Sequence, residues 1–138
     1  MTSNTKSIGV AFEDQNIIGA DKIYSASEFG YTTDAQGSVT QLTDKSTAVT
    51  LNKSAGRITM NAASLATVTN VTFTLNNSYI SANDVLIVTL SGGLATAGTY
   101  NVFVSSLGAG TATITLRNIS AGPLLEAVII NFALIHCV

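Results

Sequence analysis

Charged residues are scarce in this chain of 138 residues, because only 10% are Asp, Glu, Lys or Arg. A typical soluble domain carries about 25%. Tryptophan is absent, and there is one proline and one cysteine, Cys137. A single cysteine excludes an internal disulfide and a zinc site built from several cysteines. Disorder over the whole chain is also excluded, because 46% of the residues are hydrophobic and so apolar a chain collapses.

The same scarcity excludes two kinds of partner. The net charge is −2 and no basic cluster occurs, so we expect no nucleic-acid binding. The longest apolar run, residues 127–138, is interrupted by Asn131 and His136. It is shorter than the roughly 20 residues that a membrane-spanning helix needs, so we expect no membrane insertion. Residues 1–6 lack the apolar core of a signal peptide, which predicts synthesis and maturation in a reducing cytosol.

The few charges are distributed unevenly. Six of the eight acidic residues lie in the first 44 positions, whereas residues 58–138 contain only Asp84, Arg117 and Glu126 besides His136. A free monomer usually needs a charged surface to remain dispersed. Thr, Ser and Asn must supply nearly all the polarity of the second region, which favours a surface covered by identical neighbours. The alternative is a neutral domain that its hydroxyl groups alone keep in solution.

The chain divides into two regions at Gly37. Residues 1–37 mix charges, glycines and short apolar pairs such as Ile17-Ile18, without a helical period. We therefore expect an extended N-terminal arm over 1–37, with one short strand or turn near residues 7–12. Residues 38–138 are expected to form the folded domain.

Alternating apolar and polar residues with many β-branched side chains predict strands after Gly37. About eight are expected, over residues 38–43, 47–51, 56–60, 71–76, 84–90, 100–105, 111–118 and 127–135. Residues 61–66 have helical propensity, and Asn61 could cap a single helical turn there. Strands at roughly 10-residue spacing with Gly-rich turns predict an all-β fold, either a β-sandwich or a jelly roll.

Two of the predicted strands lack alternation. Residues 84–90 are apolar on both faces, which predicts a central strand. Residues 127–135 are apolar except for Asn131, so both faces of the last strand should be buried, one in the core and the other against a neighbouring subunit. We therefore predict a homotrimer, with an interface that contains Val128, Ile129, Ile130, Phe132 and Leu134.

Residues for catalysis or metal binding are few. Asp84, Glu126 and His136 are the main titratable groups of the domain, and His136 stands third from the end of the sequence. The residue types of a Ser-His-Asp triad are present, but we expect no enzyme activity, because proton transfer needs titratable groups held close together. Asp34 and Asp44 are too isolated for a calcium site, and His136 and Cys137 should point in opposite directions, so no metal or cofactor is expected.

Two further patterns are better explained by structure than by ligand binding. The sequence Ser91-Gly92-Gly93 lacks the lysine and the following helix of a phosphate-binding loop, which predicts a turn. Tyr79 and Tyr100 could form a platform for sugar, but we expect them to pack in the core or in turns.

Several segments together resemble a pattern that recurs in small virion proteins of tailed bacteriophages. They are residues 43–53 (TDKSTAVTLNK), 56–61 (GRITMN), 83–88 (NDVLIV), Gly93 with 98–100 (GTY), 116–122 (LRNISAG) and 126–133 (EAVIINFA). The similarity covers roughly residues 37–136 and leaves the arm unmatched. It implies a phage structural protein with a β-sandwich or jelly-roll fold, and no functional residues carry over from it.

Two functions remain open. The first is a capsid decoration (cement) protein on the virion surface, which binds the major capsid protein and stabilises the shell as an oligomer. The arm would attach it to the shell. The alternative is a host-recognition module, the head of a tail fibre or spike that binds a cell-surface glycan.

Overall fold

The computed structural model describes residues 21–137 and separates the chain into two compact units, Met1–Gly30 and Tyr31–Val138. Within the first unit, residues 21–30 contain no helix or strand. The second unit begins at Tyr31 and its first strand at Gln36, so the folded domain starts before Gly37, where we expected its boundary. The strand or turn expected near residues 7–12 lies outside the described residues.

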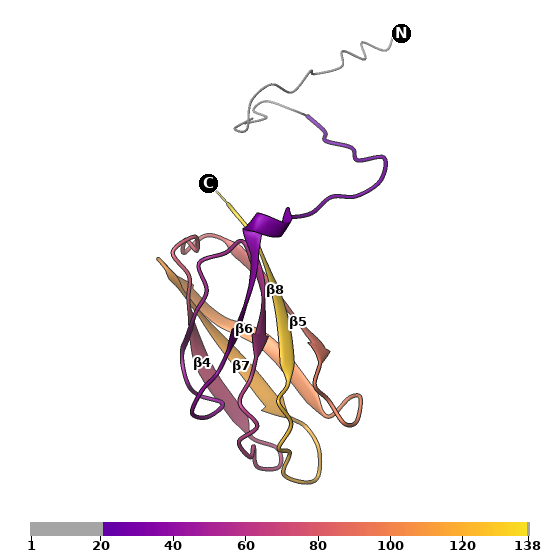
Figure 1. Cartoon of the computed structure of the whole chain (residues 1–138), viewed down its shortest axis with the longest axis vertical. Coiled ribbons are helices and arrows are strands. Elements are labelled where there is room, and N and C mark those ends of the chain that lie inside the picture. The colour runs from indigo at the N-terminus through magenta and orange to yellow at the C-terminus, as the bar shows by residue number, and fades with distance from the viewer. Residues whose placement is uncertain (1–20, 138) are drawn as a thin grey trace, which may run out of the picture. The chain divides into compact units, whose positions relative to one another are not determined.

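The second unit is all-β, as the sequence predicts. One short 3-10 helix, η1 (Thr33–Ala35), precedes eight strands. These are β1 (Gln36–Thr40), β2 (Val49–Thr50), β3 (Ala55–Thr59), β4 (Asn70–Asn76), β5 (Val85–Gly92), β6 (Tyr100–Gly108), β7 (Thr111–Asn118) and β8 (Ile129–Ile135) (Figure 1).

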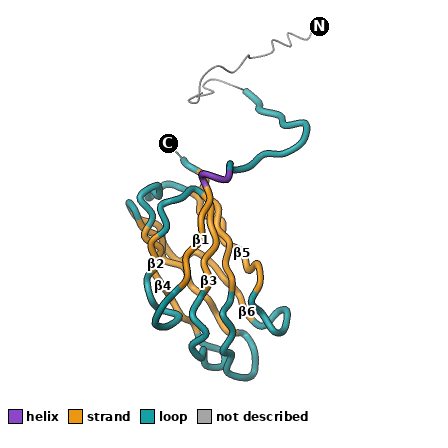
Figure 2. The backbone as a smooth tube through the Cα atoms, in the orientation of Figure 1, coloured by secondary structure: helices purple, strands orange, loops and turns teal. Residues whose placement is uncertain are grey.

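The strands form two four-stranded sheets, with the orders β1-β3-β8-β5 and β2-β4-β7-β6. Successive strands from β1 to β6 alternate between the two sheets, and the connecting loops lie at the two ends of the strands (Figure 2). The β1–β3 and β2–β4 ladders are parallel and the other four are antiparallel. A jelly roll is an antiparallel architecture, so the two parallel ladders depart from one of the folds that we expected.

Both sheets contribute side chains to one hydrophobic core. In β4 and β7, alternate residues such as Phe73 and Ile114 are buried, and these two are direct cross-strand partners. In β3 and β8, Ile58 and Ile130 are likewise partners and fully buried. Because side chains alternate along a strand, the other face of each strand points away from this core.

Two expectations about individual segments are wrong. Residues 61–66 form no helical turn, because the segment is extended and Leu65 pairs as a β-bridge with Leu124. The Asn61 side chain accepts a hydrogen bond from the Ala63 N–H, but no helix follows it. Strand β5 lies at an edge of its sheet instead of the centre. Its second apolar face, with Val85 and Ile87, points away from the core and is exposed in the single chain.

Candidate interaction surface

The last strand, β8, alternates between buried and exposed side chains. Of the five residues that we expected at an oligomer interface, four are buried in the core of the single chain, namely Val128, Ile130, Phe132 and Leu134. Only Ile129 lies on the opposite face, together with Asn131, Ala133 and Ile135. The single chain therefore buries one face of this strand in the core, and the burial of the other face against a neighbouring subunit stays a prediction. The second face is apolar because of Ile129, Ala133 and Ile135, and nothing in the described chain covers it fully.

We call the side of the β1-β3-β8-β5 sheet that points away from the core its outer face. An apolar patch, made of Val85, Ile87, Ala133 and Ile135, lies on this face. Val85 is the cross-strand partner of Ile135, and Ile87 that of Ala133, so the four side chains adjoin. Val85, Ile87 and Ile135 are 48%, 46% and 51% exposed. This is the surface of the domain that resembles an uncovered interface.

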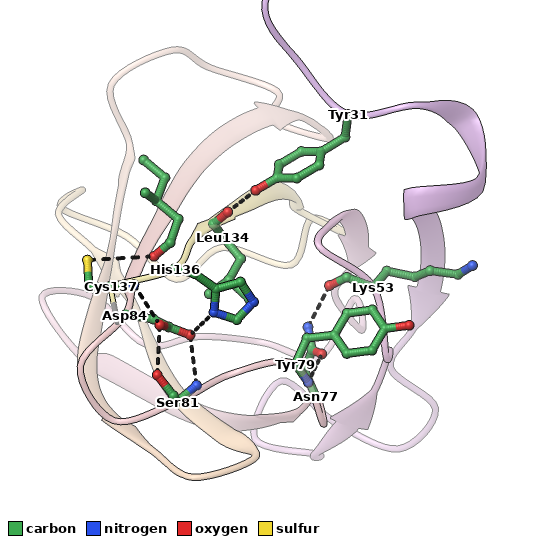
Figure 3. A network of polar contacts seen from close by, with 10 residues as sticks. Tyr31, Lys53, Asn77, Tyr79, Ser81, Asp84, Leu134, His136 and Cys137 are labelled. Atoms are coloured by element: carbon green, nitrogen blue, oxygen red, sulfur yellow. Dashed lines mark hydrogen bonds and ion pairs between the residues drawn. The ribbon is translucent and has the colours of Figure 1, made fainter. Parts of the chain in front are cut away.

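A cluster around the buried carboxylate of Asp84 lies near the C-terminal end of β8 (Figure 3). The Ser81 hydroxyl donates to Asp84 Oδ1 at 2.7 Å, and the Ser81 N–H donates to Oδ2 at 2.8 Å. The Cys137 N–H donates to Oδ1 at 3.1 Å, and His136 Nδ1 lies 3.0 Å from Oδ2. The pKa of Asp84 is lowered well below its usual range, chiefly by the hydrogen bond from the Ser81 backbone.

The Asp84 cluster contains the residue types of a serine protease triad but not its arrangement. In a triad the serine bonds to the histidine and the histidine to the aspartate. Here the Ser81 hydroxyl and His136 both bond to Asp84, so the histidine is not placed to take the proton of the serine. The cluster instead ties the loop before β5 to the residues after β8. Tyr31 adds a second tie at this end of the domain, because its hydroxyl donates to the Leu134 carbonyl.

A second polar cluster joins Lys45, Glu126 and Tyr100. The buried Lys45 ammonium donates to the backbone carbonyls of Asn61 and Glu126, each at 2.6 Å. Burial lowers the pKa of Lys45, and the negative charge of Glu126 opposes that shift. The Tyr100 hydroxyl donates to Glu126 Oε2 at 2.7 Å, which lowers the pKa of Glu126, while burial raises that of Tyr100.

No pattern in the sequence indicates this second cluster. A lysine between Asp44 and Ser46 is typical of an exposed turn, and no local pattern shows that Asn61 and Glu126 surround it. Of the two places expected for Tyr100, the core or a turn, the structure shows the core, since the residue is 4% exposed. All three side chains are therefore committed to contacts within the chain.

The other candidate ligands also make local contacts. Asp44 Oδ1 accepts hydrogen bonds from the Ser46 N–H and from the Ser46 and Thr47 hydroxyls, which closes the turn after β1. Those bonds lower the pKa of Asp44. Among residues 21–137 no group of three or more His, Cys, Asp or Glu is arranged to hold a metal ion. No helix in this part of the chain is long and apolar enough to cross a membrane.

Comparison with known proteins identifies no relative: neither a protein-family model, nor a curated protein, nor a solved structure matches this chain.

Proposed function

We propose that this chain is a structural protein of a phage virion, which decorates the capsid and stabilises the shell as an oligomer, most simply a homotrimer. In this proposal the two sheets pack face to face as a β-sandwich, and the protein has no catalytic role. The observation that carries the proposal is the apolar patch on the outer face, in a domain that has few charges to keep such a surface in water.

The surface available to solvent has even less charge than the composition suggests. Of the three Asp, Glu and Arg residues in 58–138, Asp84 is buried and bonded to four groups, and Glu126 accepts the Tyr100 hydroxyl. Arg117 is then the only one of the three without such a contact within residues 21–137. A second copy of this chain fits this surface best, because a neutral apolar patch needs no charged counterpart.

The unit Met1–Gly30 supplies the charges that the domain lacks. It contains four acidic residues and two lysines, and its sequence has no strand pattern comparable to β4. In this proposal the arm contacts the major capsid protein, while the domains contact one another. Many weak contacts of this kind act together, because each one raises the effective concentration of the next.

The test uses phage particles that lack this protein. We expect them to release their DNA at a lower temperature than complete particles do, and to adsorb to host cells at an unchanged rate. Adding the purified chain back should restore the release temperature. Normal particle stability with slow adsorption would overturn this proposal in favour of a host-recognition module.

A further inference from the structure

A shallow hollow of about 320 Å³ lies on the outer face of the β1-β3-β8-β5 sheet. Its polar side chains come from three adjacent strands: Gln36 from β1, Arg57 from β3 and Asn131 from β8. Arg57 and Asn131 are direct cross-strand partners, and Gln36 is the partner of Ala55. Because Ala55 is small, space remains between the longer polar side chains. The volume is at the lower end of the range for small-molecule sites.

The hydrogen bonds within the chain leave a defined set of groups free in this hollow. Among residues 21–137, Arg57 makes no ion pair and no side-chain hydrogen bond. Asn131 Oδ1 accepts the Ser91 hydroxyl at 2.9 Å, so the NH2 group of this amide has no partner in the described chain. Gln36 Nε2 donates to the Tyr31 carbonyl at 2.9 Å, so its Oε1 can still accept. The hollow therefore offers two neighbouring donor groups and one acceptor.

That set complements a carboxylate next to a hydroxyl group. A guanidinium binds a carboxylate through two parallel hydrogen bonds, and the Asn131 amide can add a third. Strands β1, β3, β5 and β8 contain no Asp or Glu, so no carboxylate on this sheet competes for Arg57. Gln36 Oε1 can accept from a hydroxyl, which acetate does not provide.

We propose that the hollow binds a small hydroxylated carboxylic acid, of the hexuronic acid class. This inference goes beyond capsid binding and does not depend on it, so either can fail alone. The ligand has two sources of the same chemistry, the free acid or a terminal residue of an acidic polysaccharide. The hollow shares no lining residue with the apolar patch and borders it, because Ala55 of the hollow is the cross-strand partner of Ala133 of the patch.

The experiment titrates the full chain with galacturonate, and follows binding by calorimetry or by backbone amide NMR shifts. We expect shifts centred on Arg57 and Asn131, and no comparable binding of galactose, acetate or inorganic phosphate at equal concentration. Arg57→Gln should weaken binding about tenfold, which corresponds to the loss of a hydrogen bond to a charged group. The matched variant Arg117→Gln, in the other sheet, should bind as the parent chain does.

Several results would overturn the proposal. Equal binding of galactose would show that the carboxylate is not recognised, and equal binding of acetate would show that the hydroxyl is not. Equal binding of phosphate would show that the hollow does not select a carboxylate among anions. An equal effect of Arg57→Gln and Arg117→Gln would place the ligand elsewhere. Each variant is first compared with the parent chain by thermal unfolding, so that a folding defect is recognised. Tri-galacturonate distinguishes the two sources: tighter binding than the monomer indicates a polysaccharide end, and equal binding indicates the free acid.

Discussion

The ammonium group of Lys45 donates at 2.6 Å to the backbone carbonyl of Glu126, a residue 81 positions further along the chain. It donates equally closely to the carbonyl of Asn61. The Gln41 side chain, also buried, donates to the Lys45 carbonyl and accepts from the Asn61 N–H. Lys45 and Gln41 thus link the turn after β1 to the segment after β3, and Lys45 links it also to the segment before β8.

We expect Lys45→Met to lower the free energy of unfolding by about 2 kcal/mol, although methionine fills most of the same space. The reason is that the substitution leaves two carbonyl groups without their donor in a buried place. Urea unfolding at neutral pH measures the loss. The matched control is Lys53→Met, which removes a single exposed bond to the Asp34 carbonyl and should cost no more than about 0.5 kcal/mol. Equal losses for the two variants would contradict this account of Lys45.

The lowered pKa of Asp84 implies that the free energy of unfolding of the domain falls in acid. Its pKa is lowered in the folded chain, mainly by the Ser81 N–H, so between the folded and unfolded pKa values the unfolded chain binds more protons. The stabilisation is complete above the unfolded pKa near 3.8 and is lost as the pH falls through the lower folded value. We expect Asp84→Asn to be less stable than the parent chain at neutral pH, with a difference that shrinks below about pH 4.

Urea unfolding measured from neutral pH down to about pH 2 tests the role of Asp84. Asp44 and Glu126 also have lowered pKa values, so the parent chain keeps losing stability in acid for other reasons. The informative quantity is therefore the difference between the parent chain and Asp84→Asn. Asp34→Asn is the control, because the Asp34 side chain makes no hydrogen bond within residues 21–137. A difference for Asp84→Asn that does not change with pH would contradict the prediction.

Gly56 lies where β3 passes over Leu51 and Phe132. A Cβ atom at this position would come within 2.6 Å of Leu51 Cδ2 and 2.8 Å of Phe132 Cε1. We expect Gly56→Ala to destabilise the domain by about 1–3 kcal/mol, the usual cost of overpacking a core. Gly122→Ala is the control, since a Cβ there meets nothing within 4 Å. Thermal unfolding compares the two, and similar melting temperatures would show that Leu51 and Phe132 move aside easily.

The sequence predicts those parts of the fold that depend on local alternation. The strand over residues 111–118 has the predicted bounds, and the strand predicted over 71–76 begins one residue earlier, at Asn70. The second strand is recognisable in the sequence because Val71, Phe73 and Leu75 alternate with polar residues. Local alternation does not predict the position of a strand within its sheet. Residues 85–90 are apolar on both faces, and this pattern is equally compatible with a central strand and with an edge strand whose outer face binds another subunit.

Local alternation of apolar and polar residues does not predict contacts between segments that are far apart in the sequence. Nothing near Lys45 indicates that its charge meets carbonyl groups at positions 61 and 126. Likewise, the alternation of β8 is concealed because Ile129, Ala133 and Ile135 on its outer face are as apolar as its core residues. The polar hollow was missed for a similar reason, since Gln36, Arg57 and Asn131 are adjacent only through strand pairing.

If the apolar patch forms the interface of the proposed trimer, a charge placed in it should prevent assembly. We expect Ile87→Asp to dissociate the trimer into monomers at micromolar concentration while costing no more than about 1 kcal/mol of fold stability. Native mass spectrometry gives the oligomeric state. The control is Phe103→Asp on β6 of the other sheet, a residue that is 40% exposed and should leave the trimer intact. Ile130→Asp, by contrast, should prevent folding, because it buries an unpaired charge in the core.

A monomeric parent chain would refute the trimer. A trimer that survives Ile87→Asp would show that another surface forms the interface. Dissociation by Phe103→Asp would move the interface to the β2-β4-β7-β6 sheet.

Deleting residues 1–30 and deleting residues 1–36 should have different effects on the melting temperature of the domain. Deleting residues 1–30 should leave the melting temperature of the domain unchanged, because the folded unit begins at Tyr31. Deleting residues 1–36 should lower it, because the longer deletion removes the first residue of β1 and Tyr31, whose hydroxyl bonds to the Leu134 carbonyl. A lost bond of this kind costs about 1 kcal/mol. Tyr31→Phe in the full chain should reproduce that part of the loss.

In co-sedimentation with particles that lack the protein, we expect the chain without residues 1–30 to remain in the supernatant and the full chain to pellet. If both pellet equally, attachment resides in the domain, and the arm has another role.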